Sequence, residues 1–288
     1  MNTSLKPIDL ADALIVGELL SLPDQLNTKE TLYKDKPEQE TALEEALEAL
    51  GTGLFAMNEH RRNYKINEKA AWKEFKREGQ KTKSKDENIS KNVPELQQYI
   101  VGFFAEIKPS LDALSKAMNV ILSSSFKEWE TSTGEDNIPQ SGKAIGEYIK
   151  ANTPENKLQF GKDLEQFINS NTRWLGYLTT VVDKKDDQGN LTAITPFVFE
   201  QKHRTVIPQL FTHSDGYQEP VLNFMNRATQ ELILFMINTI VFSFQIGAKD
   251  LFLTKVKDKA GHQHYRWVPL EAAQKLQELQ NSQNSASV

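Results

Sequence analysis

Residues 95–129 read ELQQYIVGFFAEIKPSLDALSKAMNVILSSSFKEW, and this stretch decides the fold class. Its apolar side chains recur every three or four residues, which places them on one face of an α-helix. They are Leu96, Ile100, Phe103, Ile107, Leu111, Leu114, Met118 and Ile121. Pro109 lies inside the stretch and removes the hydrogen bond to the carbonyl of Ala105, so we expect a bend or a split there.

The same helical period recurs along most of the chain. It predicts further helices over residues 8–21, 38–78, 154–178 and 221–246. Gly51-Thr52-Gly53 predicts a kink or a break in the second of these, and Thr153 is placed to cap the third. The sequence therefore predicts an all-α protein, a multi-helix bundle with a small C-terminal β-hairpin over 251–256 and 262–268.

The segments between these helices are polar or rich in proline and glycine. We expect loops over residues 79–94 and 130–142, and irregular chain over 195–220 because of Pro196 and Pro208. Residues 179–182 and 191–194 flank the turn sequence DDQGN and predict a small hairpin. The organisation that follows has N-terminal helices with a basic helix and loop in 1–94, a main helical core in 95–248, and a hairpin with a frayed tail in 249–288. We expect these parts to fold as one cooperative domain.

Composition excludes several classes of protein. The chain has no cysteine, so disulfides, thiolate nucleophiles and cysteine-bound zinc are excluded, and a reducing compartment fits best. The apolar run near residue 10 is interrupted by Asp9, Asp12 and Glu18, unlike a signal peptide. Residues 232–248 carry no charge but number only seventeen, against the ~20 that a membrane span needs. We therefore expect a buried central helix, no membrane span and a cytoplasmic location.

No group of residues is arranged for catalysis. The GTGLFA string at 51–56 matches a dinucleotide-binding pattern, but that motif needs a preceding strand and here follows a predicted helix. His262 and His264 lack a third metal ligand, and His213 beside Asp215 is a pairing that a polar loop produces by chance. Any two of the 39 acids could converge in the folded chain, although no pattern supports it. We expect no catalytic residue, no metal and no cofactor, and the sequence argues against an enzyme.

A one-sided stripe of cations is the most specific surface feature. Residues 61–91 hold 11 Lys and Arg against 5 Asp and Glu, whereas the remainder is acidic. Helical geometry places five of these cations on one narrow face: Arg62, Lys65, Lys69, Lys73 and Lys76. Such a stripe attracts a phosphate backbone or an acidic partner. The alternative is an ordinary solvated face, answered by the acidic stretch 38–48 of the same protein.

Two stretches resemble a known family. FFAE at 103–106 with LDAL at 111–114, followed by NTRWL at 171–175, resembles the helical layout of bacterial HEPN-like proteins, over residues 95–245. That resemblance implies an all-α, commonly dimeric protein of toxin–antitoxin or phage-defence systems. Active members cut RNA with an Arg followed four to six residues later by a His. The corresponding VVDKK at 181–185 has neither residue, so the resemblance implies the scaffold without the nuclease.

These observations favour a non-catalytic helical interaction or scaffold protein of a bacterial cytoplasm, which binds a protein partner or itself as a homodimer. The first alternative is a protein that binds RNA or DNA through the basic helix 61–77. A HEPN-type RNase is a second alternative, which the missing motif disfavours.

Overall fold

The computed structural model describes residue 33 and residues 36–81, 88–124, 146–148, 150–153, 155–184, 186–187, 189–248, 251–257 and 263–269. Helices account for most of these residues, and the strands form small antiparallel sheets, so the predicted fold class is confirmed. The helix predicted at 8–21, the loop at 130–142 and the frayed tail lie outside the described residues. The chain divides into two compact units, and each is described by itself. The boundaries expected near residues 94 and 248, and the single cooperative domain, stay predictions.

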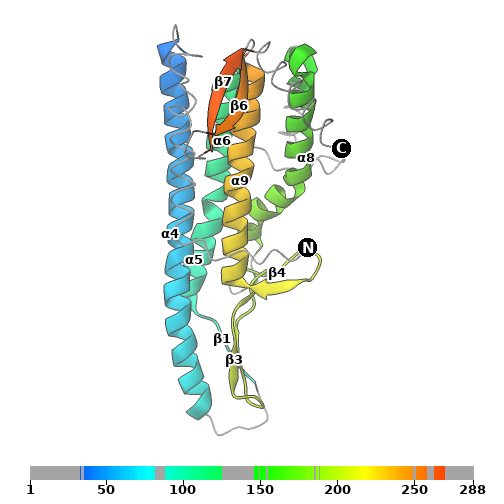
Figure 1. The fold of residues 1–288 in the computed structure, drawn as a ribbon. Helices are drawn as coiled ribbons and strands as arrows, with labels where there is room; N and C mark the ends of the chain where they lie inside the picture. Colours follow the sequence, from blue (N-terminus) through cyan, green and yellow to red (C-terminus); the bar gives the residue numbers. More distant parts are fainter. Residues whose placement is uncertain are drawn as a thin grey trace, which may run out of the picture. The chain divides into compact units, whose positions relative to one another are not determined.

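Helix α4 (Pro37–Lys81) is one uninterrupted α-helix, drawn as a single long coil in Figure 1. The break predicted at Gly51-Thr52-Gly53 is therefore wrong. At Gly53 an added Cβ would lie 2.3 Å from Ser110 Oγ, so this glycine permits close approach of another helix. The local glycine signal was real, but its cause is packing and not a turn.

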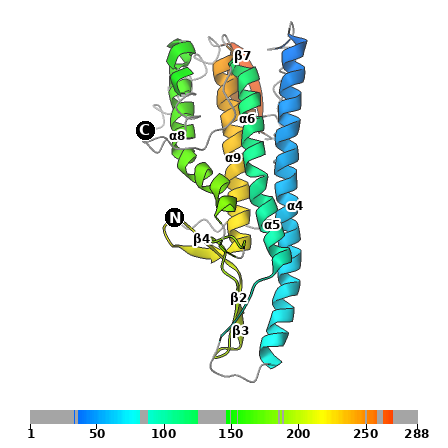
Figure 2. The ribbon, with the colours of Figure 1, turned by 180° about the vertical axis from the view of Figure 1, so that it is seen from behind.

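The first unit comprises residues 50–111 and 174–234 together with a part of the N-terminal segment. It contains the larger part of α4 and the N-terminal half of α9 (Val221–Gly247). Strands β1, β2 and β3 form an antiparallel sheet in that order, and β4 pairs with β5 (Figure 2). The other elements of this unit are β1 (Ile89–Lys91), α5 (Pro94–Ala105), η2 (Val181–Asp183), β2 (Phe197–Glu200), β3 (Thr205–Ile207), β4 (Leu210–Thr212) and β5 (Gln218–Pro220).

Aromatic side chains form the core of the first unit. Phe211 stacks on Phe224 with ring centroids 3.7 Å apart, and Phe104 packs on both rings. Phe75 of α4 contacts Phe197 and Phe199 of the three-stranded sheet. These rings fix α4, α5, α9 and the strands against one another, because large buried aromatic surfaces dominate the energetics of a core.

Several connections in this unit differ from the prediction. Residues 89–91 and four segments within 197–220 are strands, where loop and irregular chain were expected. These strands have three or four residues each, too few for a two-residue period to show in the sequence. Pro196 and Pro208 lie just outside the strands, where a missing N–H costs no ladder bond. The hairpin predicted over 179–194 is also wrong, since Thr180 still belongs to α8 (Leu158–Thr180) and a 3₁₀ turn follows.

The split predicted at Pro109 is confirmed. Helix α5 ends at Ala105, Glu106 forms a turn, and α6 (Ile107–Leu122) begins directly afterwards. The proline N lacks a hydrogen to donate to Ala105, and helical bonding resumes with the Ser110 N–H to the Glu106 carbonyl at 3.2 Å. The second helix ends at Leu122 rather than at Trp129.

The second unit comprises residues 17–49, 112–173 and 235–288. It contains the beginning of α4, most of α6 and α8, the C-terminal half of α9, η1 (Glu155–Lys157), and the hairpin of β6 (Leu251–Lys257) and β7 (Gln263–Pro269). The predicted C-terminal hairpin is thus confirmed, with Leu251 opposite Pro269. In the core of this unit Phe167 stacks on Phe235 with centroids 5.5 Å apart and lies beside Phe242.

A fully buried lysine closes one helix end in the second unit. Lys157 Nζ donates to the carbonyl of Gln245 at 2.6 Å and to that of Leu251 at 2.9 Å. Carbonyls at a helix C-terminus lack helical partners, and a cation there also complements the helix dipole. Thr153 was expected to cap α8. Its buried hydroxyl makes no hydrogen bond, and the chain enters α8 through the 3₁₀ turn η1, so that prediction is wrong.

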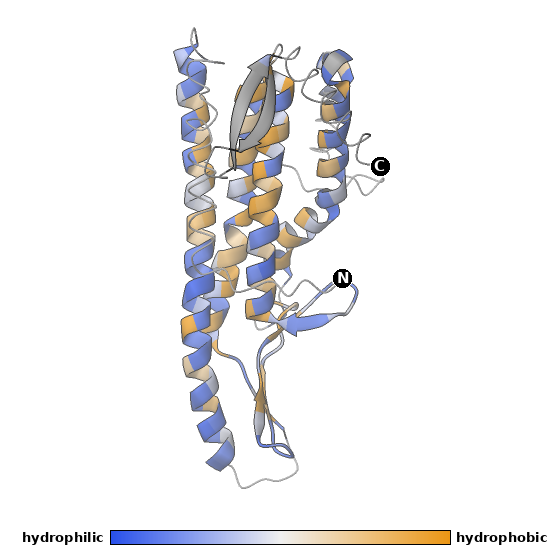
Figure 3. Cartoon of the chain, in the orientation of Figure 1, coloured by the Kyte–Doolittle hydropathy of each residue, from blue (hydrophilic) through white to orange (hydrophobic). Residues whose placement is uncertain are grey.

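Helix α9 is a long, predominantly apolar helix, as its colouring in Figure 3 shows. By length and composition it could cross a membrane, but slightly more than half of its most apolar window is buried within the protein. Thr239 and Ser243 donate to backbone carbonyls one turn earlier, at 2.7 Å each, which satisfies their hydroxyls inside the core. The burial supports a core helix and does not test the predicted location.

We expect Phe235→Asp and Met236→Asp to abolish soluble expression. Both side chains are buried, and an unpaired buried charge costs several kcal/mol against a total stability of ~5–15 kcal/mol. Leu234→Asp is the matched control, because the neighbouring Leu234 is 53% exposed. Soluble yield and circular dichroism measure the outcome. Folded, soluble Phe235→Asp would show that this part of α9 is a surface.

Candidate functional site

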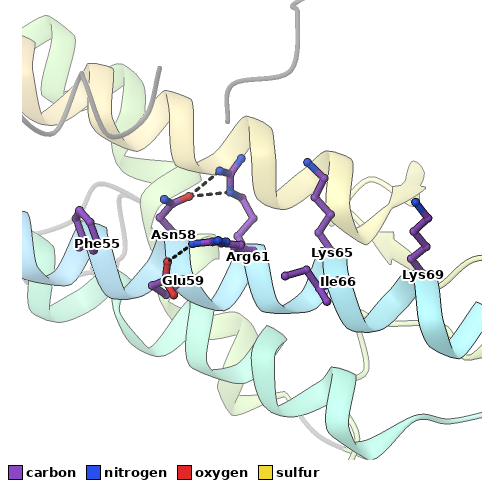
Figure 4. A pocket seen from close by; sticks show the side chains of 8 residues that line it. Phe55, Asn58, Glu59, Arg61, Lys65, Ile66 and Lys69 are labelled. Atoms are coloured by element: carbon purple, nitrogen blue, oxygen red, sulfur yellow. Dashed lines mark hydrogen bonds and ion pairs between the residues drawn. The ribbon is translucent and has the colours of Figure 1, made fainter. Parts of the chain in front are cut away.

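A groove of about 670 Å³ runs along the middle of α4 (Figure 4). Its described lining combines four cations, one amide, one acid and two apolar side chains, all from this helix. They are Phe55, Asn58, Glu59, Arg61, Arg62, Lys65, Ile66 and Lys69. The described lining belongs to the first unit. Continuous helical geometry brings these residues together, since their separations repeat every three to four positions.

Arg61 fixes the edge of the groove. Its side chain is 5% exposed, and its Nε and Nη2 donate to Asn58 Oδ1 at 3.1 and 2.6 Å. Its Nη1 donates to Asn226 Oδ1 of α9 at 2.7 Å. Hydrogen bonds from an ionised donor are the stronger class, so Arg61 holds this turn of α4 against α9. It acts as a positioning residue rather than as part of the exposed surface.

The five cations predicted for the site are only partly gathered in the groove. Arg62, Lys65 and Lys69 line it, with Lys65 and Lys69 extending to the same side of the helix (Figure 4). Lys73 is exposed one turn further along α4. Lys76 is half-buried, and its ammonium lies 4.8 Å from the centroid of the Trp72 ring. The stripe exists as one helical face, but its last member is directed to an aromatic ring of its own helix.

Two exposed apolar side chains complete the surface and were not anticipated. Phe55 is 53% exposed and Ile66 is 58% exposed, and both line the groove between or beside the cations. Single exposed apolar residues are common on protein surfaces. Here Phe55 and Ile66 lie three turns apart, on the face of α4 that carries Arg62 and Lys69. The signal was present in the sequence as Phe55 and Ile66 on the polar side of an amphipathic helix.

Glu59 and Arg62 form the charged centre of the groove. Arg62 Nη1 lies 3.6 Å from Glu59 Oε1, and the side chains are 68% and 48% exposed for Arg62 and Glu59. Exposed pairs of this kind contribute little stability, ~0.3–0.5 kcal/mol for helix neighbours. The pair is weak enough to exchange one ionic partner for another without disturbing the fold.

A buried hydrogen-bonded network lies behind this face. Tyr64 donates to Glu68 Oε1 at 3.2 Å and is within 3.3 Å of Gln209 Oε1. Burial raises the pKa of Tyr64 above its ordinary range, and the nearby Glu68 carboxylate raises it further. Burial also raises the pKa of Glu68, although the hydrogen bond from Tyr64 partly opposes that change. Tyr64 and Phe75 are buried on the core side of α4.

A second polar cluster lies where the β4–β5 hairpin meets α9. His213 Nε2 lies 2.8 Å from Glu219 Oε1, and Arg227 of α9 forms an ion pair with the same oxygen. Asp215, suggested by the sequence as a neighbour of His213, instead accepts the backbone N–H of Tyr217 at 3.1 Å and shapes the turn. Glu219 is mostly buried and contacts both His213 and Arg227, so the cluster holds the β4–β5 hairpin against α9.

No protein-family profile, curated protein or solved structure is significantly similar to this chain. The HEPN-like resemblance therefore stays a prediction. Within the described ranges, no three His, Asp or Glu side chains are placed to hold a metal ion. His264 lies on β7, whereas His262 falls outside the described residues. The α4 groove is the candidate functional site that the geometry supports best.

The adjacent arginines should differ sharply in their effect on stability. We expect Arg61→Ala to lower the free energy of unfolding by ~2–3 kcal/mol, because Asn58 and Asn226 lose a charged hydrogen-bond partner in a buried setting. Arg62→Ala, the matched control, should change it by less than ~0.5 kcal/mol, since Arg62 is exposed. Urea denaturation measures both. Equal effects would contradict the anchoring role of Arg61.

Glu68 should make stability depend on pH. Its pKa is higher in the folded protein than the ordinary 4.5, so the folded state binds more protons in the window above 4.5. Stability then falls as pH rises through that window. We expect Glu68→Gln, which keeps an acceptor for Tyr64 and does not titrate, to gain stability over wild type as pH rises. Urea midpoints from pH 4 to 8 test this, with Glu74→Gln as the exposed control; a constant difference would contradict it.

Proposed function

We propose that this protein is a non-catalytic helical interaction protein that binds a protein segment through the groove face of α4. The observation that carries the proposal is the mixture on that face: Phe55 and Ile66 are exposed beside Arg62, Lys65 and Lys69. A phosphate backbone is contacted by cations and has no use for exposed aliphatic and aromatic side chains along the same line. A protein partner uses both kinds of group.

The chemistry of the face defines the partner. An amphipathic helix binds such a surface with its apolar face, and its anchor residues are spaced three and four positions apart. Fully burying a Phe or an Ile is worth ~1.5–3 kcal/mol each, and both are about half exposed here. The cations add attraction for an acidic segment, chiefly through the association rate and the choice of partner. The ligand class is therefore a helical segment with apolar anchors flanked by acids.

A designed peptide tests this directly. A labelled helical peptide with Leu at three- and four-residue spacing and Glu beside it should bind, measured by fluorescence anisotropy. We expect Phe55→Ser with Ile66→Ser to weaken binding by at least ~tenfold, because each loses about 1 kcal/mol or more of apolar contact. Leu234→Ser is the matched control, since Leu234 is exposed on another helix.

Single-stranded RNA and duplex DNA are the competing ligands in the same assay. If they bind instead, Lys65→Glu, Lys69→Glu and Lys73→Glu together should remove binding, and the salt slope should drop by ~0.7–0.9 per lost contact. That result, with no binding of the Leu/Glu peptide, would overturn the proposal in favour of the nucleic-acid alternative. Binding of a scrambled peptide equal to that of the helical one would also contradict it.

A further inference from the structure

The outward face of α4 carries a seam with the spacing of a coiled coil. Residues at alternating intervals of three and four follow a straight line along a helix and can meet a second helix. On α4 this line passes through exposed residues on the side opposite the buried core. They are Thr52, Phe55, Glu59, Arg62, Ile66 and Lys69, continued by Glu48 and Glu45 on one side and Lys73 and Lys76 on the other; of these, only Lys76 is half-buried.

Charge is segregated along this helix. Residues 37–60 hold six acids and no Lys or Arg, whereas residues 61–81 hold eight Lys and Arg against three acids. Because α4 is unbroken at Gly51-Thr52-Gly53, its acidic half cannot fold back on its basic half. Glu48 and Lys73 are separated by about 37 Å along a continuous helix at 1.5 Å per residue. Within one copy of α4, the acidic residues of the first half therefore cannot contact the basic residues of the second half.

An antiparallel second copy of α4 supplies that complement in one register. When residues 60 and 61 lie at a two-fold axis, Phe55 faces Ile66 of the other copy and Glu59 faces Arg62. Further out, Glu48 faces Lys73 and Glu45 faces Lys76. Each pair occurs twice, as an isologous interface requires. The Glu59–Arg62 pairs therefore lie nearest the axis, one Phe55–Ile66 contact lies on each side of them, and further opposite charges meet towards both ends.

Other arrangements lose this match. Sliding one helix by a heptad places Phe55 against Lys73 in one direction and against Glu59 in the other. Parallel pairing places each charged residue beside its own copy, which sets acid against acid and cation against cation. Like charges in such positions disfavour association and choose the orientation. The pattern is selective for a single antiparallel register.

We propose that two copies of this chain associate through antiparallel pairing of their α4 helices about an axis between residues 60 and 61. The inference rests on the proposed function and names its partner. The two Phe55–Ile66 contacts, one on each side of the axis, form the apolar part of the interface. The Glu59–Arg62 pair, 3.6 Å apart within one copy, exchanges for the same pair between copies. Since the remaining contacts are exposed ion pairs, the dimer weakens as salt rises.

Reversal and exchange of charge test the register. By sedimentation velocity at low salt, we expect wild type to dimerise over a concentration series. Glu48→Lys and Lys73→Glu should each raise the dissociation constant at least ~tenfold, because each replaces two attractive pairs with two repulsive ones. The double variant E48K/K73E restores opposite charges between copies and should dimerise like wild type. Glu74→Lys, exposed on the same helix but off the seam, is the matched control and should have no effect.

Exchange of charge is the decisive outcome because only a second copy of the same chain carries the compensating change. If wild type stays monomeric while the Leu/Glu peptide binds, self-pairing is overturned and the proposed function stands. If E48K/K73E is as impaired as the single variants, the register is overturned. If neither dimer nor peptide complex forms, both proposals fail. Circular dichroism checks that the variants, all at exposed positions, remain folded.

The relative orientation of the two α4 helices can be measured separately with spin labels. The chain has no cysteine, so only an introduced cysteine is labelled. A spin label on Thr52→Cys should report a separation of about 26 Å along the helix axis, since the copy of Thr52 lies 17 residues beyond its own position at 1.5 Å per residue. A label on Glu59→Cys lies near the axis and should give a separation near that of two packed helices, ~10 Å. Short distances at both sites would show parallel pairing and overturn the proposal.

Discussion

The unbroken hydrogen bonding of α4 from Pro37 to Lys81 is the constraint on which the candidate surface depends. It places residues spread over positions 45–76 on one helical face. It also fixes which charges can meet and which cannot. Two packing contacts support this continuity in the first unit: Gly53 lets Ser110 approach closely, and Arg61 ties its turn to Asn226. Without the glycine, a Cβ would occupy the space of the Ser110 hydroxyl.

Most of the fold prediction came from the regular spacing of apolar side chains along the chain. The long helices around Leu114 and Phe235, the split at Pro109 and the terminal hairpin were all visible as spacing or as a missing donor. These signals depend on neighbours in the chain, so a sequence contains them in full. The short strands were not visible, because three-residue strands such as Ile89–Lys91 exist only through pairing with distant residues. The same applies to Gly53, whose role depends on Ser110.

The charged residues of the candidate site could be predicted from the sequence, but the exposure of its apolar residues could not. Arg62, Lys65 and Lys69 share a face by helical spacing alone, which sequence reasoning supplies. Phe55 and Ile66 lie among polar residues in the sequence, but that both remain about half exposed depends on which side of α4 the core covers, and only the structure shows this. The acidic stretch 38–48, expected to answer these cations, belongs to the same continuous helix and so cannot fold back on them. The continuity of α4 thus changed the meaning of a charge pattern that local sequence had identified correctly.

The segregated charges of α4 also carry an energetic cost along the helix itself. Acids near a helix N-terminus and bases near its C-terminus favour the helix dipole, but this effect falls off within the first and last turns. Glu44 and Glu48, and likewise Lys65, Lys69 and Lys73, lie beyond those turns at like-charge spacings of four residues. Each such pair disfavours the helix by ~0.2–0.5 kcal/mol, whereas interspersed acids and bases would stabilise it. A surface of opposite charge laid along the same face removes this repulsion, so the arrangement that weakens α4 alone is the one that favours its association.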